Sequence, residues 1–248
     1  MCKKILIIHP YDKSTNFLSR IKSHLQGEFL DDLHYFSVKP NETSHTQCLN
    51  TIRDFSVTGL LLFMGHGKSN CLYGAKGDYY GTLENEIVKS EEPDKYFYED
   101  NFINEKNLSV FNEKKVIVLS CNSNAQLGRK SVENGAKVFL GFGDLPTSIQ
   151  ELKEQGEESK SGVSLGTIEQ ALKTEINDII KKSIGIGINK NYTFSGLVDL
   201  IHFVTNQKIS HYLVNQKKIS ERKLIANYLY SFKKGIKIYG NGKEKLLV

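Results

Sequence analysis

The chain has 248 residues, of which 39% are hydrophobic and 25% are charged, and its formal net charge is +5. This length fits one large α/β domain or two small ones, and either can bury an ample core without disulfides or a metal to hold it together. The four cysteines (Cys2, Cys48, Cys71 and Cys121) show no repeated spacing and no CxxC pair. This pattern argues against a disulfide framework and a structural zinc site, and we expect a reducing compartment.

The sequence contains no run of about 18 apolar residues, so it predicts no membrane-spanning helix. The apolar run within residues 1–9 is too short for a signal peptide, and no small-residue cleavage site follows it. We therefore expect this run to be the first strand of the fold and the protein to be cytoplasmic.

The first quarter of the chain alternates strand and helix patterns. Short apolar runs predict strands, and apolar residues spaced three and four apart predict amphipathic helices. The predicted strands are residues 4–9, 33–38 and 59–65, and the predicted helices are residues 14–25 and 44–55. Such alternation predicts a parallel sheet with right-handed crossovers.

The middle of the chain is more varied. Glycines and tyrosines in residues 68–82 predict a short hairpin, and the acidic, aperiodic residues 84–101 predict a surface loop. The later elements are a short helix at residues 101–111, a strand at 115–120, a helix at 125–134 ended by Gly135, and a strand at 137–142.

The last third of the chain begins with a polar, charged linker at residues 146–162. Helices are predicted at residues 164–184, 194–213 and 220–232, with a last strand and turn within 235–242. The glycine-rich residues 183–190 lack the spacing of a phosphate-binding loop and predict a helix end and a turn.

Two of the apolar runs end abruptly in a reactive side chain. One run reads Gly59-Leu-Leu-Leu-Phe-Met-Gly-His66-Gly67, and the other reads Val116-Ile-Val-Leu-Ser-Cys121-Asn-Ser123. Reactive groups in open α/β folds collect at the carboxyl ends of strands, so we expect His66 and Cys121 to lie side by side. Either feature alone is ordinary, because cysteines are often buried and His-Gly is a common turn.

The pair together has a clear chemical use. An imidazole can take the proton of a thiol and so make it a nucleophile, and an acyl intermediate then needs donors for its oxyanion. Gly67 lets a carbonyl oxygen approach the main chain, so we expect the backbone amides of Gly67 and Cys121 to be those donors.

These residues resemble the caspase-like (clan CD) cysteine peptidases, in which one strand ends in His-Gly and a later strand ends in the nucleophilic Cys. The separation of about 55 residues agrees with the caspase pattern. The context Phe63-Met-Gly-His-Gly, then Val118-Leu-Ser-Cys-Asn-Ser, then Gly135-Ala-Lys-Val-Phe-Leu-Gly-Phe-Gly143 is most similar to the CHAT and separase-type branch.

The resemblance implies a caspase-like fold, with an about six-stranded, mostly parallel sheet flanked by helices. Residues 1–248 would form a single domain, with a catalytic half at 1–144, a linker at 145–162 and a C-terminal half at 163–248. It also implies a cysteine endopeptidase that acts on a protein substrate. Such an enzyme would serve in bacterial antiviral defence or cell death, and would await an activating partner or ligand. The linker is then a candidate for self-cleavage, although an uncut linker fits equally well.

The chain departs from the family at the substrate pocket. Caspase relatives often place an acidic or amide residue two positions before the Cys to read the substrate's P1 side chain, and here that residue is Leu119. Asp12 or Asp144, each just after a predicted strand, could instead select a basic P1 residue. A turn or capping role is the more favoured interpretation of both carboxylates.

We expect no cofactor and no metal. His45 and Cys48 form an H-x-x-C pair, but two ligands do not make a zinc site. The C-terminal part is basic, with 13 Lys/Arg against 3 Asp/Glu in residues 181–248. This charge is typical of solvated helix faces, and a nucleic-acid surface is the less favoured alternative.

Two other functions fit the same residues. A catalytically silent caspase-like module could bind or signal without turnover, and the missing pocket residue favours this alternative. An acyl-transfer or hydrolase activity on a small molecule would use the same dyad in a closed pocket.

Overall fold

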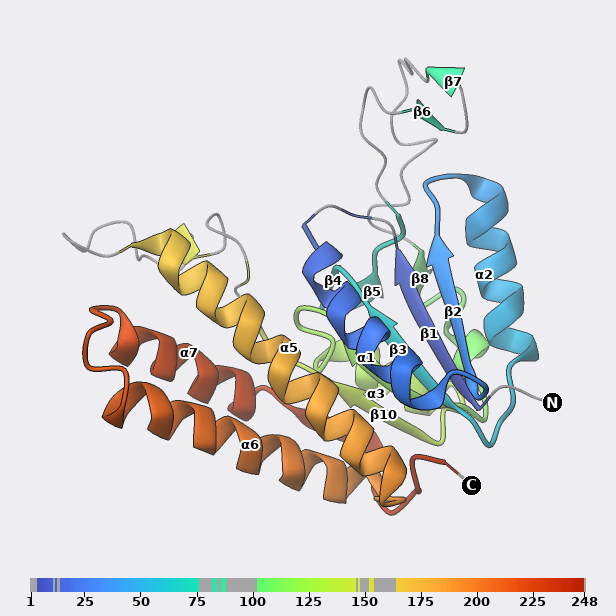
Figure 1. Cartoon of the computed structure of the whole chain (residues 1–248). Coiled ribbons are helices and arrows are strands. Elements are labelled where there is room, and N and C mark those ends of the chain that lie inside the picture. Colours follow the sequence, from blue (N-terminus) through green and yellow to red (C-terminus); the bar gives the residue numbers. More distant parts are fainter. Residues whose placement is uncertain are drawn as a thin grey trace.

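A six-stranded sheet forms the centre of the structure, which is a computed structural model (Figure 1). It describes residues 4–10, 12, 14–75, 82–83, 86–87, 102–145, 147, 152–153 and 164–247. The strand order is β11-β10-β9-β3-β1-β2, and only β11 runs antiparallel to its neighbour. The strands are β1 (Ile5–Pro10), β2 (Leu33–Val38), β3 (Leu60–Met64), β9 (Lys115–Leu119), β10 (Val138–Gly141) and β11 (Lys237–Gly240). The predicted mostly parallel, six-stranded sheet is confirmed.

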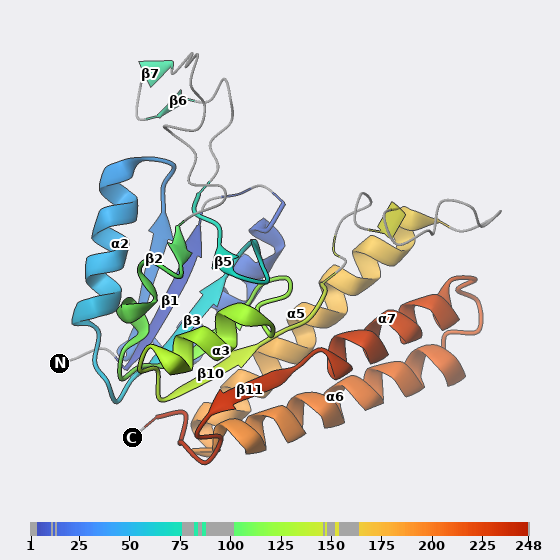
Figure 2. The same ribbon diagram turned by 180° about the vertical axis from the view of Figure 1, so that it is seen from behind.

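Helices cover both faces of this sheet, so the central strands are buried on both sides. Every residue of β1, β3, β9 and β10 is buried, as continuous apolar runs predict. Alternate residues face two separate cores: Leu62 and Ile117 belong to one, Leu61 and Val116 to the other. Figures 1 and 2 show the two layers from opposite sides.

The first core is closed by helices α1, α5, α6 and α7, and the second by α2, α3 and the 3-10 turn η3. The bounds are α1 (Ser19–Phe29), preceded by the 3-10 turn η1 (Asn16–Leu18), α2 (Glu42–Asp54), η3 (Leu108–Phe111), α3 (Gln126–Glu133), α5 (Leu165–Asn189), α6 (Phe194–Val214) and α7 (Arg222–Lys234). Apart from η3, the helices predicted at these positions are confirmed, within about five residues at their ends.

Polar side chains cap three of the helices where the sequence offers them. Asn41 Oδ1 accepts from the amide of Ser44 at 2.8 Å and starts α2. Thr193 Oγ1 accepts from the amide of Gly196 at 3.1 Å and starts α6, and Ser164 does the same for α5. These bonds satisfy amide groups that have no partner inside the helix.

A small antiparallel sheet lies beyond the carboxyl end of β3. It contains β4 (Gly67–Lys68), β5 (Cys71–Leu72) and β8 (Ile103–Asn104), in the order β4-β5-β8. The predicted hairpin therefore begins as expected. Strand β6 (Thr82–Leu83), at the end of the predicted hairpin, pairs with β7 (Glu86–Ile87) within the predicted loop 84–101. The rest of that loop lies outside the described residues.

The helix predicted at residues 101–111 is wrong. The segment instead holds strand β8 and the turn η3. The side chain of Asn107 accepts from the amide of Asn104 at 2.8 Å and donates to Phe102 O at 2.8 Å. These local bonds offer the backbone an alternative to the helix, as asparagine often does.

The turn predicted at residues 183–190 is also wrong, because α5 continues through Asn189. Its glycines lie where neighbouring elements come close. A Cβ on Gly187 would stand 2.8 Å from Leu246 Cδ1, and one on Gly185 would stand 3.0 Å from Glu28 Oε2. Close packing against these neighbours therefore offsets the low helix propensity of glycine.

Most of the linker predicted at residues 146–162 lies outside the described residues. Within the described ranges, no helix is both long enough and apolar enough to cross a membrane.

The two-sided burial of the sheet predicts a large cost for truncation at its centre. Phe139 is fully buried on β10, and Phe139→Ala should lower the free energy of unfolding by about 3 to 5 kcal/mol through lost burial and a residual cavity. Urea unfolding followed by circular dichroism measures this change. Phe203→Ala is the matched control, because its ring is 58% exposed and its loss should cost less than about 0.5 kcal/mol. Equal effects of the two variants would contradict the assigned burial.

Candidate active site

The register of the central strands brings His66 and Cys121 together. Strands β3 and β9 are parallel neighbours in which Met64 pairs with Leu119. Each reactive residue comes two positions after its member of this pair, and neighbouring strands are about 4.8 Å apart. The amide of Gly65 also donates to Leu119 O at 3.2 Å, which keeps the two chains together past the strand ends.

His66 and Cys121 line the same pocket at this edge of the sheet. Leu119 and Gly65 also line this pocket. The rest of its lining comes from the segment around η1, the segment after β10, and α5. These segments contribute Thr15, Phe17, Leu18, Leu145, Thr147 and Ile176. Cys121 is partly exposed here, whereas Cys48 and Cys71 are buried.

The turn that carries Cys121 is fixed by its own polar groups. Asn122 has a positive φ of 54°, a conformation that asparagine tolerates better than most residues, and its amide donates to Gly143 O at 2.9 Å. The buried hydroxyl of Ser123 accepts from the amide of Phe142 at 2.9 Å and faces Ser120 O at 2.9 Å. These bonds join the ends of β9 and β10 and set the direction of the turn.

The loop after β1 contacts the imidazole of His66 at its Nε2 atom. Ser14 Oγ lies 2.6 Å from His66 Nε2, and Asp12 Oδ2 lies 3.7 Å from the same nitrogen. Asp12 Oδ1 accepts from both the amide and the hydroxyl of Ser14, each at 2.6 Å. Because Asp12 takes the hydroxyl of Ser14, this serine does not cap a helix, and the turn η1 begins only at Asn16.

The direction of these hydrogen bonds sets the tautomer of His66. Ser14 has one hydroxyl proton and gives it to Asp12, so Ser14 Oγ must accept from Nε2–H of a neutral His66. The Nδ1 atom then carries the lone pair and can accept a proton. Burial raises the pKa of Asp12, but the hydrogen bonds with His66 and Ser14, and the charge that His66 carries when it is protonated, outweigh this effect, so the pKa of Asp12 lies well below its usual range.

A second histidine supports this loop. His9, at the end of β1, is buried, with Nε2 3.3 Å from Thr15 Oγ1 and Nδ1 3.4 Å from the hydroxyl of Tyr35. Thr15 in turn donates to Asp12 O at 3.4 Å. Burial lowers the pKa of His9 from 6.5 to about 4, so this histidine is neutral near pH 7.

Gly67, one of the two predicted oxyanion donors, packs closely against its neighbours. A Cβ on Gly67 would overlap Ser120 Oγ, so this glycine lies directly against the residue before Cys121. The amide of Tyr73 donates to His66 O at 3.0 Å, and alternation along an antiparallel pair then directs the Gly67 amide away from β5. Gly67 is not among the residues that line the pocket in the described structure.

The two carboxylates proposed for a basic P1 side chain lie in different places. Asp12 contacts Ser14 and His66 on the far side of the imidazole from its Nδ1 atom. Asp144 is exposed, and the described pocket lining does not include it. Leu119, by contrast, lines the pocket at the position where caspase relatives place a P1-reading residue.

The side chains of His45 and Cys48 are both buried in the fold. His45 Nε2 accepts from the amide of Ala75 at 3.1 Å, and its Nδ1 lies 2.7 Å from Asn41 O. Cys48 is fully buried, and burial raises the pKa of its thiol to about 12. In the part of the chain that the structure describes, no group of three or more His, Cys, Asp or Glu could hold a metal ion.

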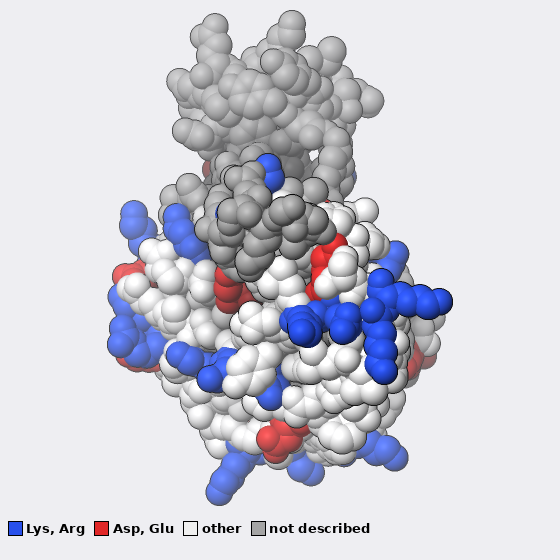
Figure 3. All heavy atoms as spheres, turned by 90° about the vertical axis from the view of Figure 1, so that its left-hand side faces the viewer, with Lys and Arg blue, Asp and Glu red and all other residues white. Residues whose placement is uncertain are grey.

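The basic C-terminal residues occupy surface positions. Figure 3 shows Lys and Arg side chains spread over the face that lies at the left of Figure 1, with few Asp and Glu among them. Lys217, Lys218 and Lys223 are exposed on the α6–α7 turn and the first turn of α7. Exposed lysines at these positions agree with both alternatives, a solvated helix face and a nucleic-acid surface.

Sequence reasoning missed the role of Ser14 and the contribution of α5 to the pocket. The spacing of Asp12 and Ser14 was a usable signal, because an Asp two residues before a Ser commonly forms an Asx turn. The position of Ile176 had no comparable signal, because only tertiary packing brings α5 to the strand ends.

Comparison of the chain with protein-family models, with curated proteins and with solved structures finds no match.

The buried, neutral His9 predicts a loss of stability in mild acid. The unfolded chain binds a proton at His9 below about pH 6.5, and the folded chain does so only near pH 4, so stability falls as the pH falls between these values. Between pH 7 and pH 4.5 this group should cost about 2 to 3 kcal/mol. Urea unfolding of the wild type and His9→Gln at both pH values tests this. The same acid-induced loss in both proteins would show that His9 is not the cause.

The contact between Ser14 and His66 predicts a single tautomer of the neutral imidazole. Ser14→Ala removes the acceptor for Nε2–H, so the wild type should show the Nε2–H form and the variant a mixture of both tautomers. Nitrogen-15 NMR of the histidine side chains distinguishes the two forms. Ser210→Ala, on the exposed face of α6, is the matched control and should leave the His66 signals unchanged.

Proposed function

We propose that the protein is a caspase-like cysteine endopeptidase, with Cys121 as nucleophile and His66 as general acid and base. The observation that carries this proposal is the pairing of Met64 with Leu119, which puts both residues at one pocket. A partly exposed cysteine beside a histidine whose far nitrogen is held by Ser14 is the arrangement that nucleophilic catalysis by a thiol requires.

The reaction would run in two stages. Cys121 gives its proton to His66 Nδ1, and the sulfur then bonds to the substrate's carbonyl carbon. His66 returns this proton to the amide nitrogen as the C–N bond breaks, which leaves a thioester on Cys121. A water molecule, deprotonated by His66, then cleaves the thioester and releases the acid.

Polar groups around the dyad would serve both stages. The amides of Gly67 and Cys121 would donate to the oxyanion, because the Gly67 amide is directed away from β5. Asp12, through Ser14, would keep His66 in the Nε2–H form and stabilise the imidazolium that forms when Nδ1 takes a proton. This role resembles that of the carboxylate in a serine triad, with a hydroxyl interposed.

The sheet order and the three matching segments around residues 59–67, 116–123 and 135–143 support a caspase-like fold of the CHAT type for this domain. By the same resemblance, we place the enzyme in the cytoplasm, as a regulated protease of bacterial defence or cell death. It would cleave a protein substrate after an activating partner or ligand has bound.

One observation favours the alternative of a catalytically silent module. Cys121 Sγ lies 3.7 Å from Leu145 O and donates a hydrogen bond to it. A hydrogen bond from the thiol stabilises the neutral form over the thiolate, which lowers reactivity. In an enzyme, this bond must break when substrate or an activator binds.

Labelling with iodoacetamide between pH 5 and pH 9, with the mass read at each cysteine, separates the two functions. The enzyme predicts selective labelling of Cys121, with a rate that falls by about 100-fold or more in His66→Ala. Cys48 and Cys71 are internal controls, because both are buried and should react slowly.

Labelling of Cys121 at a rate no higher than that of the two buried thiols would favour the silent module. A substrate assay completes the test: Cys121→Ala should keep the circular dichroism spectrum of the wild type and lose all cleavage. Cleavage that persists in Cys121→Ala would exclude this cysteine as the nucleophile.

A further inference from the structure

We infer that the exposed face of α6 binds a second copy of this chain, with the two α6 helices antiparallel across a twofold axis. Helix α6 contributes no residue to the described lining of the pocket beside Cys121. A dimer through this face is therefore independent of the proposed peptidase activity.

Helix α6 lies at the edge of the molecule, and neighbouring elements cover only one side of it (Figures 1 and 2). It packs against α5 and α7. The opposite side is exposed, and five of its residues follow one another at alternate spacings of four and three: Asp199, Phe203, Asn206, Ser210 and Leu213. This spacing is typical of the seam along which two helices pack together. We call these five residues the α6 stripe.

Large apolar side chains are exposed on and beside the α6 stripe. The ring of Phe203 is 58% exposed, Leu213 is 46% exposed, and the neighbouring Val214 is 61% exposed. These are three of the eight large hydrophobic residues that are exposed in the described part of the chain. Apolar side chains that gather in this way on one helix indicate an interaction surface.

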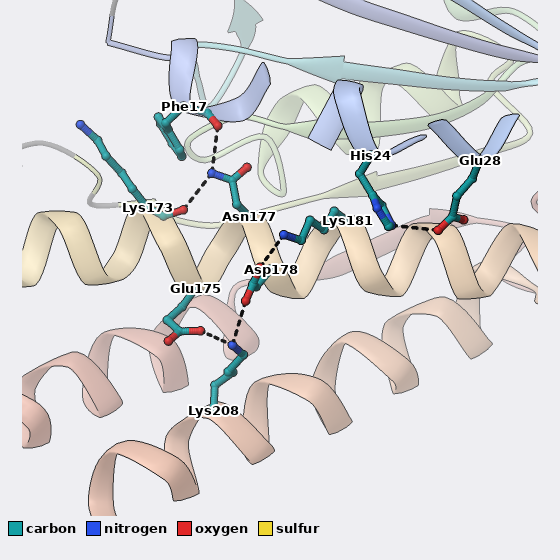
Figure 4. Close-up of polar contacts among 9 residues, drawn as sticks. All are labelled: Phe17, His24, Glu28, Lys173, Glu175, Asn177, Asp178, Lys181 and Lys208. Atoms are coloured by element: carbon teal, nitrogen blue, oxygen red, sulfur yellow. Dashed lines mark hydrogen bonds and ion pairs between the residues drawn. The ribbon is translucent and has the colours of Figure 1, made fainter. Parts of the chain in front are cut away.

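The α6 stripe carries no charge between its two ends. Lys208 is the only Lys, Arg, Asp or Glu in residues 200–214. Its side chain lies on the other side of the helix, where it binds Glu175 and Asp178 of α5 at 2.5 Å and 3.1 Å (Figure 4). Two copies of a chain with a net charge of +5 can therefore meet along this stripe without placing like charges at its centre.

Opposite charges flank the two ends of α6. Asp199 lies near its start, and Lys217 follows it in the α6–α7 turn, and both residues are exposed. Arg222 donates to Lys217 O at 3.2 Å, which fixes the backbone of this turn. Among the described residues, neither Asp199 nor Lys217 forms an ion pair. Both charges are thus available to a partner.

The order of these residues makes the face complementary to itself. A twofold axis beside position 208 puts each residue opposite the residue equally far on the other side of 208. The pairs are Phe203 with the partner's Leu213, Asn206 with the partner's Ser210, and Asp199 with the partner's Lys217. The same axis repeats each pair, so the contact closes on itself and the assembly stops at two copies.

Apolar burial and charge have different roles in this contact. Each pair of Phe203 with the partner's Leu213 removes apolar surface from water, which favours association. The pairs of Asp199 with the partner's Lys217 lie at the exposed rim, where they add little affinity but set the direction of the helices. A parallel arrangement would put Asp199 opposite the partner's Asp199, and this repulsion favours the antiparallel one.

The length of α6 limits the strength of the dimer. The helix has 21 residues and is about 31 Å long. One helix face of this length gives an interface at the small end of the range for specific contacts, so we expect a weak dimer. At the dilution of a urea titration the chain would then be a monomer, and Phe203 would be exposed there.

Sedimentation equilibrium of the full chain over a range of protein concentrations tests the dimer. The wild type should shift from monomer to dimer as the concentration rises. Asp199→Lys, or Lys217→Glu, places like charges opposite each other at both ends of the contact. Each single variant should therefore raise the dissociation constant at least about tenfold, a change of about 1.4 kcal/mol.

The double variant, with Asp199→Lys and Lys217→Glu, exchanges the two charges and should restore most of the wild-type affinity. Both positions are exposed, so all three variants should keep the circular dichroism spectrum of the wild type. Lys106→Glu is the matched control for Lys217→Glu. Lys106 is exposed between β8 and η3, beside the second core, and this change should leave the dissociation constant unaltered.

Three results would contradict the inference. A wild type that sediments as a monomer at every concentration would overturn the dimer. It would leave this face to an acidic partner, since Lys233 of α7 borders the stripe and donates to Asn206 Oδ1 at 2.9 Å. A dimer that neither single variant weakens would place the contact elsewhere. Weakening by both single variants that the double variant does not reverse would overturn the antiparallel order.

Discussion

The pairing of β3 with β9 is the constraint on which the candidate site depends. Because the two strands are parallel neighbours with Met64 opposite Leu119, the residues that follow them emerge at the same edge and the same height. A shift of one residue in this register would move every side chain of a strand to the other face of the sheet and would bury a polar strand end. The burial of both strands on two sides keeps the register fixed, and packing in the core thereby positions His66 and Cys121.

Around this pair, a series of contacts leads from the buried His9 to the partly exposed His66. His9 is neutral inside the protein and holds Thr15, Thr15 holds the backbone of Asp12, and Asp12 holds Ser14, which contacts His66. His9 and Thr15 are buried, Asp12 and His66 are partly exposed, and Ser14 is exposed. The orientation of a partly exposed imidazole is thus traced back to a group in the core, and His9 makes this chain of contacts sensitive to mild acid.

Helix α5 links the site to the C-terminal layer. On one side Asn177 fastens η1, and on the other Glu175 and Asp178 bind Lys208 of α6 (Figure 4). Within α1, His24 Nε2 lies 3.2 Å from Glu28 Oε1, and both side chains lie against Gly185 of α5. The helix therefore directs its polar groups to neighbouring helices and its apolar residue Ile176 to the pocket.

The sequence by itself determined the sheet strands and most helices, because buried parallel strands are continuous apolar runs with local boundaries. It also predicted that His66 and Cys121 follow neighbouring strands, and both residues line one pocket. It did not determine the contact of Ser14 with His66 or the pocket wall formed by Leu145 and Ile176, which join residues far apart in the chain. Local patterns gave wrong predictions at two places. At residues 101–111 the side chain of Asn107 bonds to the backbone of its neighbours, and at 183–190 the glycines lie where other elements pack closely. Only the tertiary structure decided these features, because they depend on which surfaces come within contact distance, and hydrophobic periodicity specifies a buried face without specifying its partner.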